Sequence, residues 1–186
     1  MATTLYDYST NWMKGKNGST GNYQFRARII ENSADPNTNK SNVTCKLEMH
    51  CDTDDRHVMW NANATKNQPY ATLTGDVTAT GSRISTYKKT TEWKNLVSWT
   101  GDIVHNSDGT KNITVNFRWV AGELVYYPDT FYIGQPTVSL TAFPRSSIST
   151  GSGWVTGALY VSNGSMWKPG KVGAVSDGTQ WKTVDS

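Results

Sequence analysis

Alternation of apolar and polar residues is clearest from His105 to Val120, HNSDGTKNITVNFRWV. The apolar side chains share one face of an extended chain: Ile113, Val115, Phe117 and Trp119. A half-buried strand is therefore predicted here, because successive side chains of a strand point to opposite faces. The preceding Ser107-Asp108-Gly109-Thr110 has turn chemistry, since Asp accepts a bond from its own backbone two residues on and Gly accepts a positive φ.

The segment before the turn, Leu96 to Val104, predicts a second strand. Two strands joined by a short turn favour a hairpin with one buried face, and Gly101 is the candidate for a β-bulge. Trp99 and Trp119 fall at strand positions and are expected in the core. This hairpin is the element around which the other strands are expected to stack.

The same period of two predicts further strands at 22–30, 42–51, 71–80 and 136–143. The positions expected to point inward are Tyr23, Phe25, Ala27 and Ile29, then Val43, Cys45, Leu47, Met49 and Cys51, and finally Val138, Leu140 and Ala142. No segment keeps the period of an amphipathic helix over three turns. The chain is thus expected to be all-β, an antiparallel immunoglobulin-like β-sandwich first and a jelly roll second.

Four regions are expected along the chain. Residues 1–22 are an N-terminal arm or edge strand, and residues 23–145 are the sandwich. Residues 146–153 have the Ser and Gly content of a flexible linker. Residues 154–186 form a small appendage of β-hairpin repeats, because the unit V-S-[ND]-G-[ST]-x-W-K occurs at Val161–Lys168 and again at Val175–Lys182.

Composition restricts the function. A formal net charge of +3 over 186 residues is too small for a nucleic-acid footprint. No apolar run is long enough to span a membrane, and the N-terminus lacks the basic and apolar regions of a signal peptide. We therefore expect neither nucleic-acid binding, nor membrane insertion, nor export through a signal peptide.

The cysteines are expected to be free and buried. Cys45 and Cys51 lie six residues apart on one predicted strand, roughly 20 Å at about 3.3 Å per residue, which is too far for a disulfide. A metal site from these cysteines with His50 and His57 has no common zinc spacing, and alternation turns His50 to the opposite face. No metal and no cofactor are expected.

Catalytic motifs are missing from the sequence. The sequence contains no nucleophile elbow, no phosphate-binding loop and no dinucleotide fingerprint. His105, Asp108 and Gly109 are interpreted as residues that stabilise a turn, in preference to His105 acting as a base. The protein is therefore expected not to be an enzyme.

Aromatic residues of the appendage are the candidates for contact with a ligand or partner: Trp154, Tyr160, Trp167 and Trp181. A region of about 33 residues is too small to bury them in a core of its own. Packing against protein is the first expectation, and stacking on a glycan is the second.

Two segments resemble a known family. The HNSDGT turn with its strand, and the later LTAFPRSS at Leu140 to Ser147, are similar to β-sandwich repeats of tail-associated structural proteins from phages of Gram-positive bacteria. The segment YVSNGSMWKPGKVGAVSDGTQWK resembles the short G-x-W hairpin repeats that end many phage tail and baseplate proteins.

The resemblance implies a structural protein of the virion, made in the host bacterial cytoplasm. Its place would be the tail tip, the baseplate or a fibre, with a role in host-surface attachment. Other virion proteins, copies of this chain and a host cell-surface glycan are the expected partners. A non-catalytic carbohydrate-binding module is the alternative, and a capsid decoration or head fibre protein is a further one.

Overall fold

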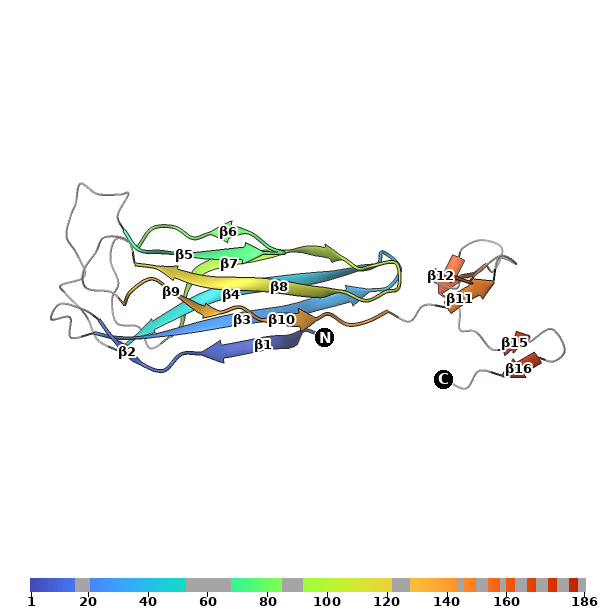
Figure 1. The fold of residues 1–186 in the computed structure, drawn as a ribbon, viewed down its shortest axis with the longest axis horizontal. Helices are drawn as coiled ribbons and strands as arrows, with labels where there is room; N and C mark the ends of the chain where they lie inside the picture. Colours follow the sequence, from blue (N-terminus) through green and yellow to red (C-terminus); the bar gives the residue numbers. More distant parts are fainter. Residues whose placement is uncertain are drawn as a thin grey trace.

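A computed structural model describes residues 1–15, 21–52, 68–84, 92–121 and 128–143, together with the backbone of six short strands between 146 and 183. In these residues the chain is all-β, without a helix, so no helix there could cross a membrane. Two antiparallel sheets of five strands each form a sandwich-like body whose strands run along its length (Figure 1).

The first sheet contains the long strands of the N-terminal half. Its members are β1 (Thr3–Ser9), β2 (Met13–Lys14), β3 (Asn22–Asp35), β4 (Lys40–Cys51) and β7 (Lys94–Val104). The strand order is β1-β3-β4-β7, and β2 pairs with β3 beyond the end of β1. Both β1 and β7 are therefore edge strands.

The second sheet is built around one central strand. Its members are β5 (Tyr70–Gly75), β6 (Ala79–Thr80), β8 (Asn112–Val120), β9 (Phe131–Gly134) and β10 (Thr137–Ser139). The order is β10-β8-β5-β6, and β9 also pairs with β8. At the β5 end, Gly75 has φ +112°, and a Cβ there would lie 2.4 Å from the backbone oxygen of Thr114.

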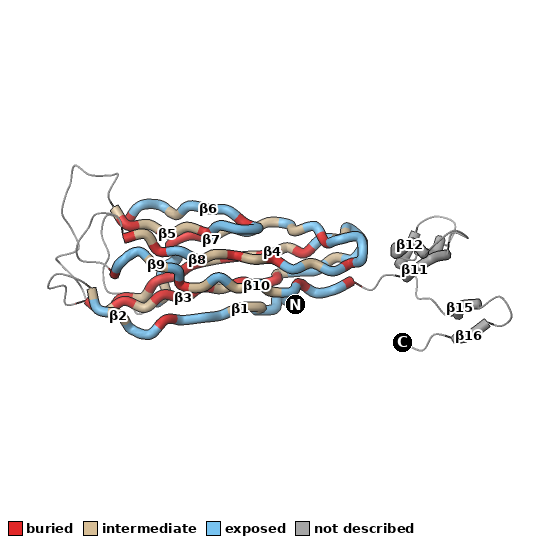
Figure 2. Tube along the Cα trace, in the orientation of Figure 1, coloured by how far each residue is buried: buried red, intermediate tan, exposed pale blue. Residues whose placement is uncertain are grey.

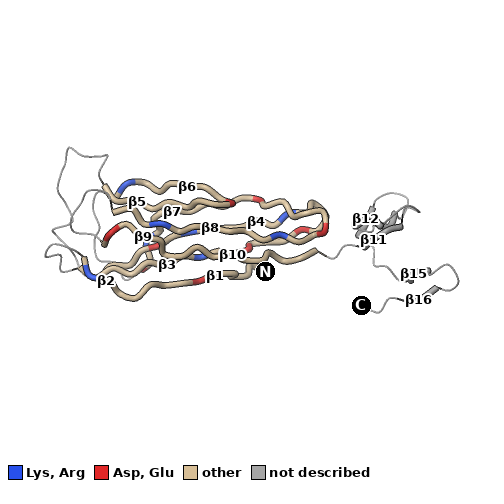
Figure 3. The backbone as a smooth tube through the Cα atoms, in the orientation of Figure 1, with Lys and Arg blue, Asp and Glu red and all other residues tan. Residues whose placement is uncertain are grey.

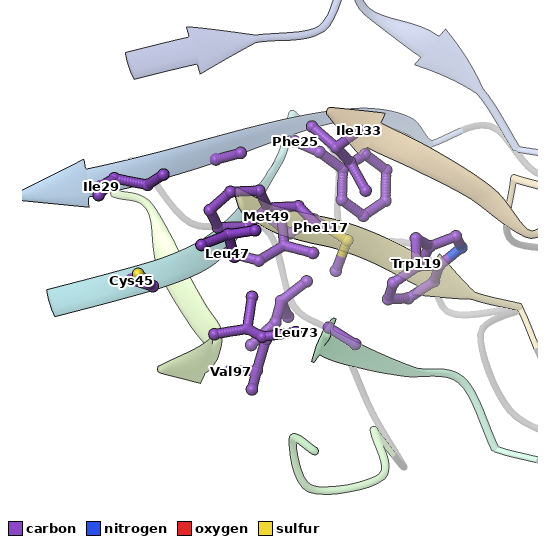
Figure 4. Close-up of a cluster of buried hydrophobic side chains, with 14 of the residues drawn as sticks. Phe25, Ile29, Cys45, Leu47, Met49, Leu73, Val97, Phe117, Trp119 and Ile133 are labelled. Atoms are coloured by element: carbon purple, nitrogen blue, oxygen red, sulfur yellow. The ribbon is translucent and has the colours of Figure 1, made fainter. Parts of the chain in front are cut away.

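Burial alternates along β3, β4 and β8, which confirms the predicted inward faces of these strands. Buried positions recur along the strands of both sheets (Figure 2), and their apolar side chains form one cluster (Figure 4). Trp119 and Phe25 are fully buried with ring centroids 5.0 Å apart, and the indole Nε1–H of Trp119 donates to the carbonyl oxygen of Pro128 at 3.1 Å. Trp99 packs against this core but stays partly exposed.

The predicted hairpin between 96–104 and 112–120 is wrong. β7 pairs with β4 in the first sheet, and β8 pairs with β5, β9 and β10 in the second. The HNSDGT segment therefore carries the chain from one sheet to the other across the core. Alternation gives each strand its buried face but does not identify the strand with which it pairs.

Two local predictions also need correction. The bulge of β7 lies at Leu96, because Leu47 pairs with Val97 while Glu48 pairs with Asn95. Gly101 pairs regularly instead, and a Cβ there would lie 2.7 Å from the indole of Trp99, so the small residue makes room for that ring. Ala142 is exposed, because β10 ends at Ser139 and the alternation stops there.

The C-terminal strands form three antiparallel pairs. β11 (Ser146–Ser149) pairs with β12 (Trp154–Gly157), β13 (Tyr160–Ser162) with β14 (Trp167–Pro169), and β15 (Ala174–Ser176) with β16 (Trp181–Thr183). The predicted linker at 146–153 differs from the structure at Ser146–Ser149, which are a strand.

Candidate functional site

The predicted turn residues lie in a compact loop between β7 and β8. The Asp108 carboxylate accepts bonds from the backbone N–H of Thr110 at 2.8 Å and from its hydroxyl at 2.7 Å. These bonds, the hydroxyl bond first, hold the pKa of Asp108 below its ordinary value. Gly109 has φ +81°, a conformation that a residue with a Cβ rarely adopts.

His105 lies inside this loop and is only 4% exposed. Its Nδ1 is 3.0 Å from the carbonyl oxygen of Gly109, and its Nε2 is 2.8 Å from the hydroxyl of Ser41 on β4. The imidazole also packs against Phe143, with ring centroids 4.2 Å apart. The Nδ1 contact therefore closes the loop on itself, and the Nε2 contact fixes the loop to β4 of the first sheet.

A buried carboxylate continues the chain of hydrogen bonds. Glu31 is 3% exposed, and its Oε1 accepts a 2.6 Å bond from the hydroxyl of Ser41. The same carboxylate accepts from the backbone N–H of Thr141 at 3.2 Å and from its hydroxyl at 2.6 Å. The Glu31–Ser41–His105 chain thus connects β3, β4, the β7–β8 loop and the segment that follows β10.

The groups of this hydrogen-bond chain differ in what they can donate. The oxygen of Gly109 only accepts, so Nδ1 of His105 is the donor of that bond. Ser41 has one hydroxyl hydrogen but contacts both Glu31 and Nε2 of His105. An ionised carboxylate beside a neutral imidazole would leave two acceptors sharing that hydrogen. The Ser41 hydroxyl therefore joins Glu31 and His105 through a single hydrogen.

The order of these groups does not match an acyl-transfer site. There the imidazole lies between the hydroxyl nucleophile and the acid, whereas here Ser41 lies between Glu31 and His105. Ser41 is also completely buried. These three hydrogen-bonded side chains are therefore assigned a structural role.

The HNSDGT turn and the LTAFPRSS segment contact each other. The backbone N–H of Phe143 donates to the carbonyl oxygen of Gly109 at 2.9 Å, and the backbone N–H of Leu140 donates to the carbonyl oxygen of Lys111 at 2.9 Å. With the His105–Phe143 ring contact, these bonds tie the HNSDGT turn to the start of the LTAFPRSS segment. The two motifs form one structural unit at the end of the sandwich.

The candidate contact residues of the appendage occupy repeated register positions. Trp154 pairs with Ser149, Trp167 with Ser162, and Trp181 with Ser176. Tyr160 pairs with Pro169 at the start of its strand. The side chains of all four candidates lie outside the described residues.

This shared register reveals a relationship that the sequence analysis missed. Ile148-Ser149-Thr150-Gly151-Ser152-Gly153-Trp154 resembles the two V-S-[ND]-G-[ST]-x-W units and departs from them at Ile148 and Thr150. In all three, Ser precedes its paired Trp by five residues. The Ser and Gly content that suggested a linker is also that of a hairpin turn, and the spacing to Trp154 was the available signal.

A second feature missed from the sequence is an aromatic row on the outer face of the first sheet. The rings of Trp12, His50 and Trp93 contact one another in that order. The outward direction of His50 was predicted by alternation, but Trp12 and Trp93 lie outside regular strand patterns, so sequence alone did not join them.

The cysteine prediction is confirmed, because Cys45 and Cys51 are free and buried. Burial raises the pKa of the Cys45 thiol to about 12, so this group is protonated at neutral pH. Among the residues described above, no group of three His, Cys, Asp or Glu side chains could hold a metal ion. His57 of the rejected zinc set lies outside the described residues.

No protein-family model, curated protein or solved structure matches this chain.

Proposed function

We propose that this protein is a structural component of a tailed phage virion, at the tail tip, the baseplate or a fibre, and that it contributes to host-surface attachment. The observation that carries the proposal is the contact between the two family-like segments. His105 and Gly109 of the HNSDGT turn contact Phe143, the fourth residue of the second segment. Because the HNSDGT turn and the LTAFPRSS segment contact each other, a domain that has one of them needs the other. This would explain why both motifs occur in the same kind of domain.

The proposed mode of action is rigid display without catalysis. A two-sheet body with a continuous apolar core provides a stable scaffold. Three hairpins of equal register place a tryptophan at the same position of each, which suits repeated contacts with other virion proteins, with copies of this chain or with a surface glycan. The edge strands β1 and β7 offer further pairing positions for self-association.

We propose that the sandwich is a variant of the immunoglobulin-like class and that the appendage is a hairpin repeat. The crossing from β7 to β8 between sheets supports the sandwich class. The pairing of β3 with β4 departs from the immunoglobulin fold. If the two-residue β2 is left out, these are the second and third strands, which lie in different sheets of an immunoglobulin domain.

A carbohydrate-binding module is the second candidate function. The exposed indole of Trp12 on the sheet surface favours it, because an aromatic ring can stack on a sugar. A capsid decoration or head fibre is a further placement of the same structural role.

The proposal is tested on phage particles from a culture that makes this protein. Particles are purified on a density gradient and analysed by mass spectrometry, and an antiserum against the chain is used for immunogold electron microscopy. We expect the chain in the particle band and gold at the tail. A chain that stays in the unassembled fraction would overturn the proposal, and gold on the head would favour the decoration protein.

A further inference from the structure

Three rings form a row on the outer face of the first sheet, away from the core. Trp12 precedes β2, His50 is on β4, and Trp93 directly precedes β7. The ring centroids of Trp12 and His50 are 5.1 Å apart, and those of His50 and Trp93 are 5.6 Å apart. Trp12 is 46% exposed, although an indole is among the most apolar side chains.

The backbone holds this aromatic row in place. On the Trp12 side, Thr10 exchanges backbone and hydroxyl bonds with Phe25 at 2.9 and 3.1 Å, and Met13 pairs with Tyr23. On the other side, the residue after Trp93 pairs with Met49. A site whose groups are already positioned loses little entropy when a ligand binds.

A guanidinium closes one end of the row. The Arg26 guanidinium lies 4.4 Å from the ring centroid of Trp93, a cation–π distance. Its Nε and Nη2 both contact Oε2 of Glu48 at 2.9 Å, and Lys46 Nζ contacts Oε1 at 2.9 Å. Glu48 is 5% exposed, so this carboxylate orients Arg26 from below while other guanidinium N–H groups remain to donate.

The charges beside the row are almost balanced. Arg26, Arg28 and Lys46 face Glu48 and Asp7, and Arg28 lies 3.3 Å from Asp7. Positive and negative residues are both scattered along the described part of the sandwich (Figure 3). Such a surface offers hydrogen-bonding groups but only a weak net field, which favours an uncharged polar ligand.

We propose that Trp12, His50, Trp93 and Arg26 form a binding site for a neutral saccharide. A sugar ring has an apolar C–H face that stacks on an exposed indole and hydroxyl groups that both donate and accept. Arg26 supplies donors, and the ring nitrogens of His50 supply one donor and one acceptor in the neutral form. The inference deepens the attachment role, on which its biological purpose rests, by naming the ligand class and a place for it on the sandwich.

The test begins with the purified full chain on an array of neutral oligosaccharides of glucose, galactose, mannose and N-acetylhexosamines. The oligosaccharide that binds most strongly on the array is then titrated calorimetrically into the wild-type chain and into its variants. We expect Trp12→Ala to weaken its affinity at least tenfold. Tyr132→Ala is the matched control, because Tyr132 is 52% exposed on the other sheet beside Arg118. The affinity of this variant for the oligosaccharide should stay within twofold of the wild type.

Two further variants distinguish loss of the site from misfolding and from binding by the appendage. Trp12→Leu retains apolar bulk without an aromatic face, so it should lose the same affinity even if Trp12→Ala fails to fold. The double variant Trp167→Ala/Trp181→Ala should bind like the wild type, which separates this site from the appendage.

Three results would overturn the inference: no binding of any neutral oligosaccharide, full affinity in both Trp12 variants, or binding lost only in the appendage variant. A chain found in particles that binds no oligosaccharide would refute this site alone. Saccharide binding by a chain absent from particles would refute the virion proposal alone.

Discussion

The imidazole of His105 packs against the ring of Phe143, with centroids 4.2 Å apart and 30° between the ring planes. His105 belongs to the loop that crosses between the sheets, and Phe143 to the segment that leaves the second sheet. Both are at least 95% buried. This contact therefore seals the end of the sandwich from which the chain continues toward the appendage.

We predict that Phe143→Ala lowers the free energy of unfolding by about 3 kcal/mol, because removal of a buried phenyl ring loses its transfer energy and leaves a cavity. Urea denaturation followed by tryptophan fluorescence measures the change. Tyr132→Ala removes an exposed ring and should change stability by less than about 0.5 kcal/mol. Equal stability of the two variants would show that the contact does not seal the fold.

The buried Glu31 gives a second prediction. Glu31→Ala removes the acceptor of the bonds from Ser41 and Thr141 and should cost about 3 kcal/mol. Glu31→Gln should cost much less, because its amide can donate to Ser41 while its oxygen accepts from Thr141. The Ser41 hydroxyl is then free to donate to a neutral His105. Equal losses in the two variants, measured by urea denaturation, would show that the bonds of this side chain to Ser41 and Thr141 add nothing to stability.

The Cys45 thiol is predicted to be unreactive in the folded protein. Its pKa is raised from 9.0 to about 12, and only the thiolate reacts with alkylating agents. Iodoacetamide at pH 8 should leave Cys45 unmodified in buffer and modify it in urea, as read by peptide mass spectrometry. Rapid modification without denaturant would mean that β4 opens readily.

The same shift predicts an alkaline loss of stability. The unfolded thiol ionises near pH 9, whereas the folded thiol keeps its proton to about pH 12. Stability from this group is therefore complete below pH 9 and falls as the pH rises through that window. In Cys45→Ala the decline measured by urea denaturation from pH 8 to 10.5 should be shallower. An identical decline would assign the effect to other groups.

Two turn carboxylates predict the behaviour in acid. The backbone N–H of Asn37 and the hydroxyl of Thr38 lower the pKa of Asp35, and Thr110 does the same for Asp108. Both groups add stability above their ordinary value of 3.8 that is lost as the pH falls through the lowered folded values. The variant Asp35→Asn/Asp108→Asn should therefore lose less stability between pH 5 and 2.5. A slope as steep as that of the wild type would argue against these bonds.

Alternation predicted the faces of the strands because burial imposes a period of two. It identified Phe25 and Leu47 as core residues without any knowledge of the sheet order. It failed for the partners of β7 and β8, because both a hairpin and a crossing between sheets give each strand one apolar face. The choice depends on contacts between distant segments, such as His105 with Ser41.

Other features had no clear signal in the sequence. Glu31 continues the inward side of β3 where an apolar residue is expected, and its burial is explained by the bonds from Ser41 and from Thr141, 110 residues away. The pairing of β11 with β12 was hidden by a Ser and Gly composition that linkers share. The Trp12–His50–Trp93 row joins three segments that only folding brings together.

The central claim is attachment by binding without bond cleavage. Its most direct test is competition on host cells: the purified full chain is added first, then phage, and the unadsorbed particles are counted while the supernatant is assayed for released sugar and peptide. We predict that adsorption falls as the concentration of the chain rises, with no release of wall fragments. Unchanged adsorption at a saturating concentration, or solubilised wall material, would contradict the account.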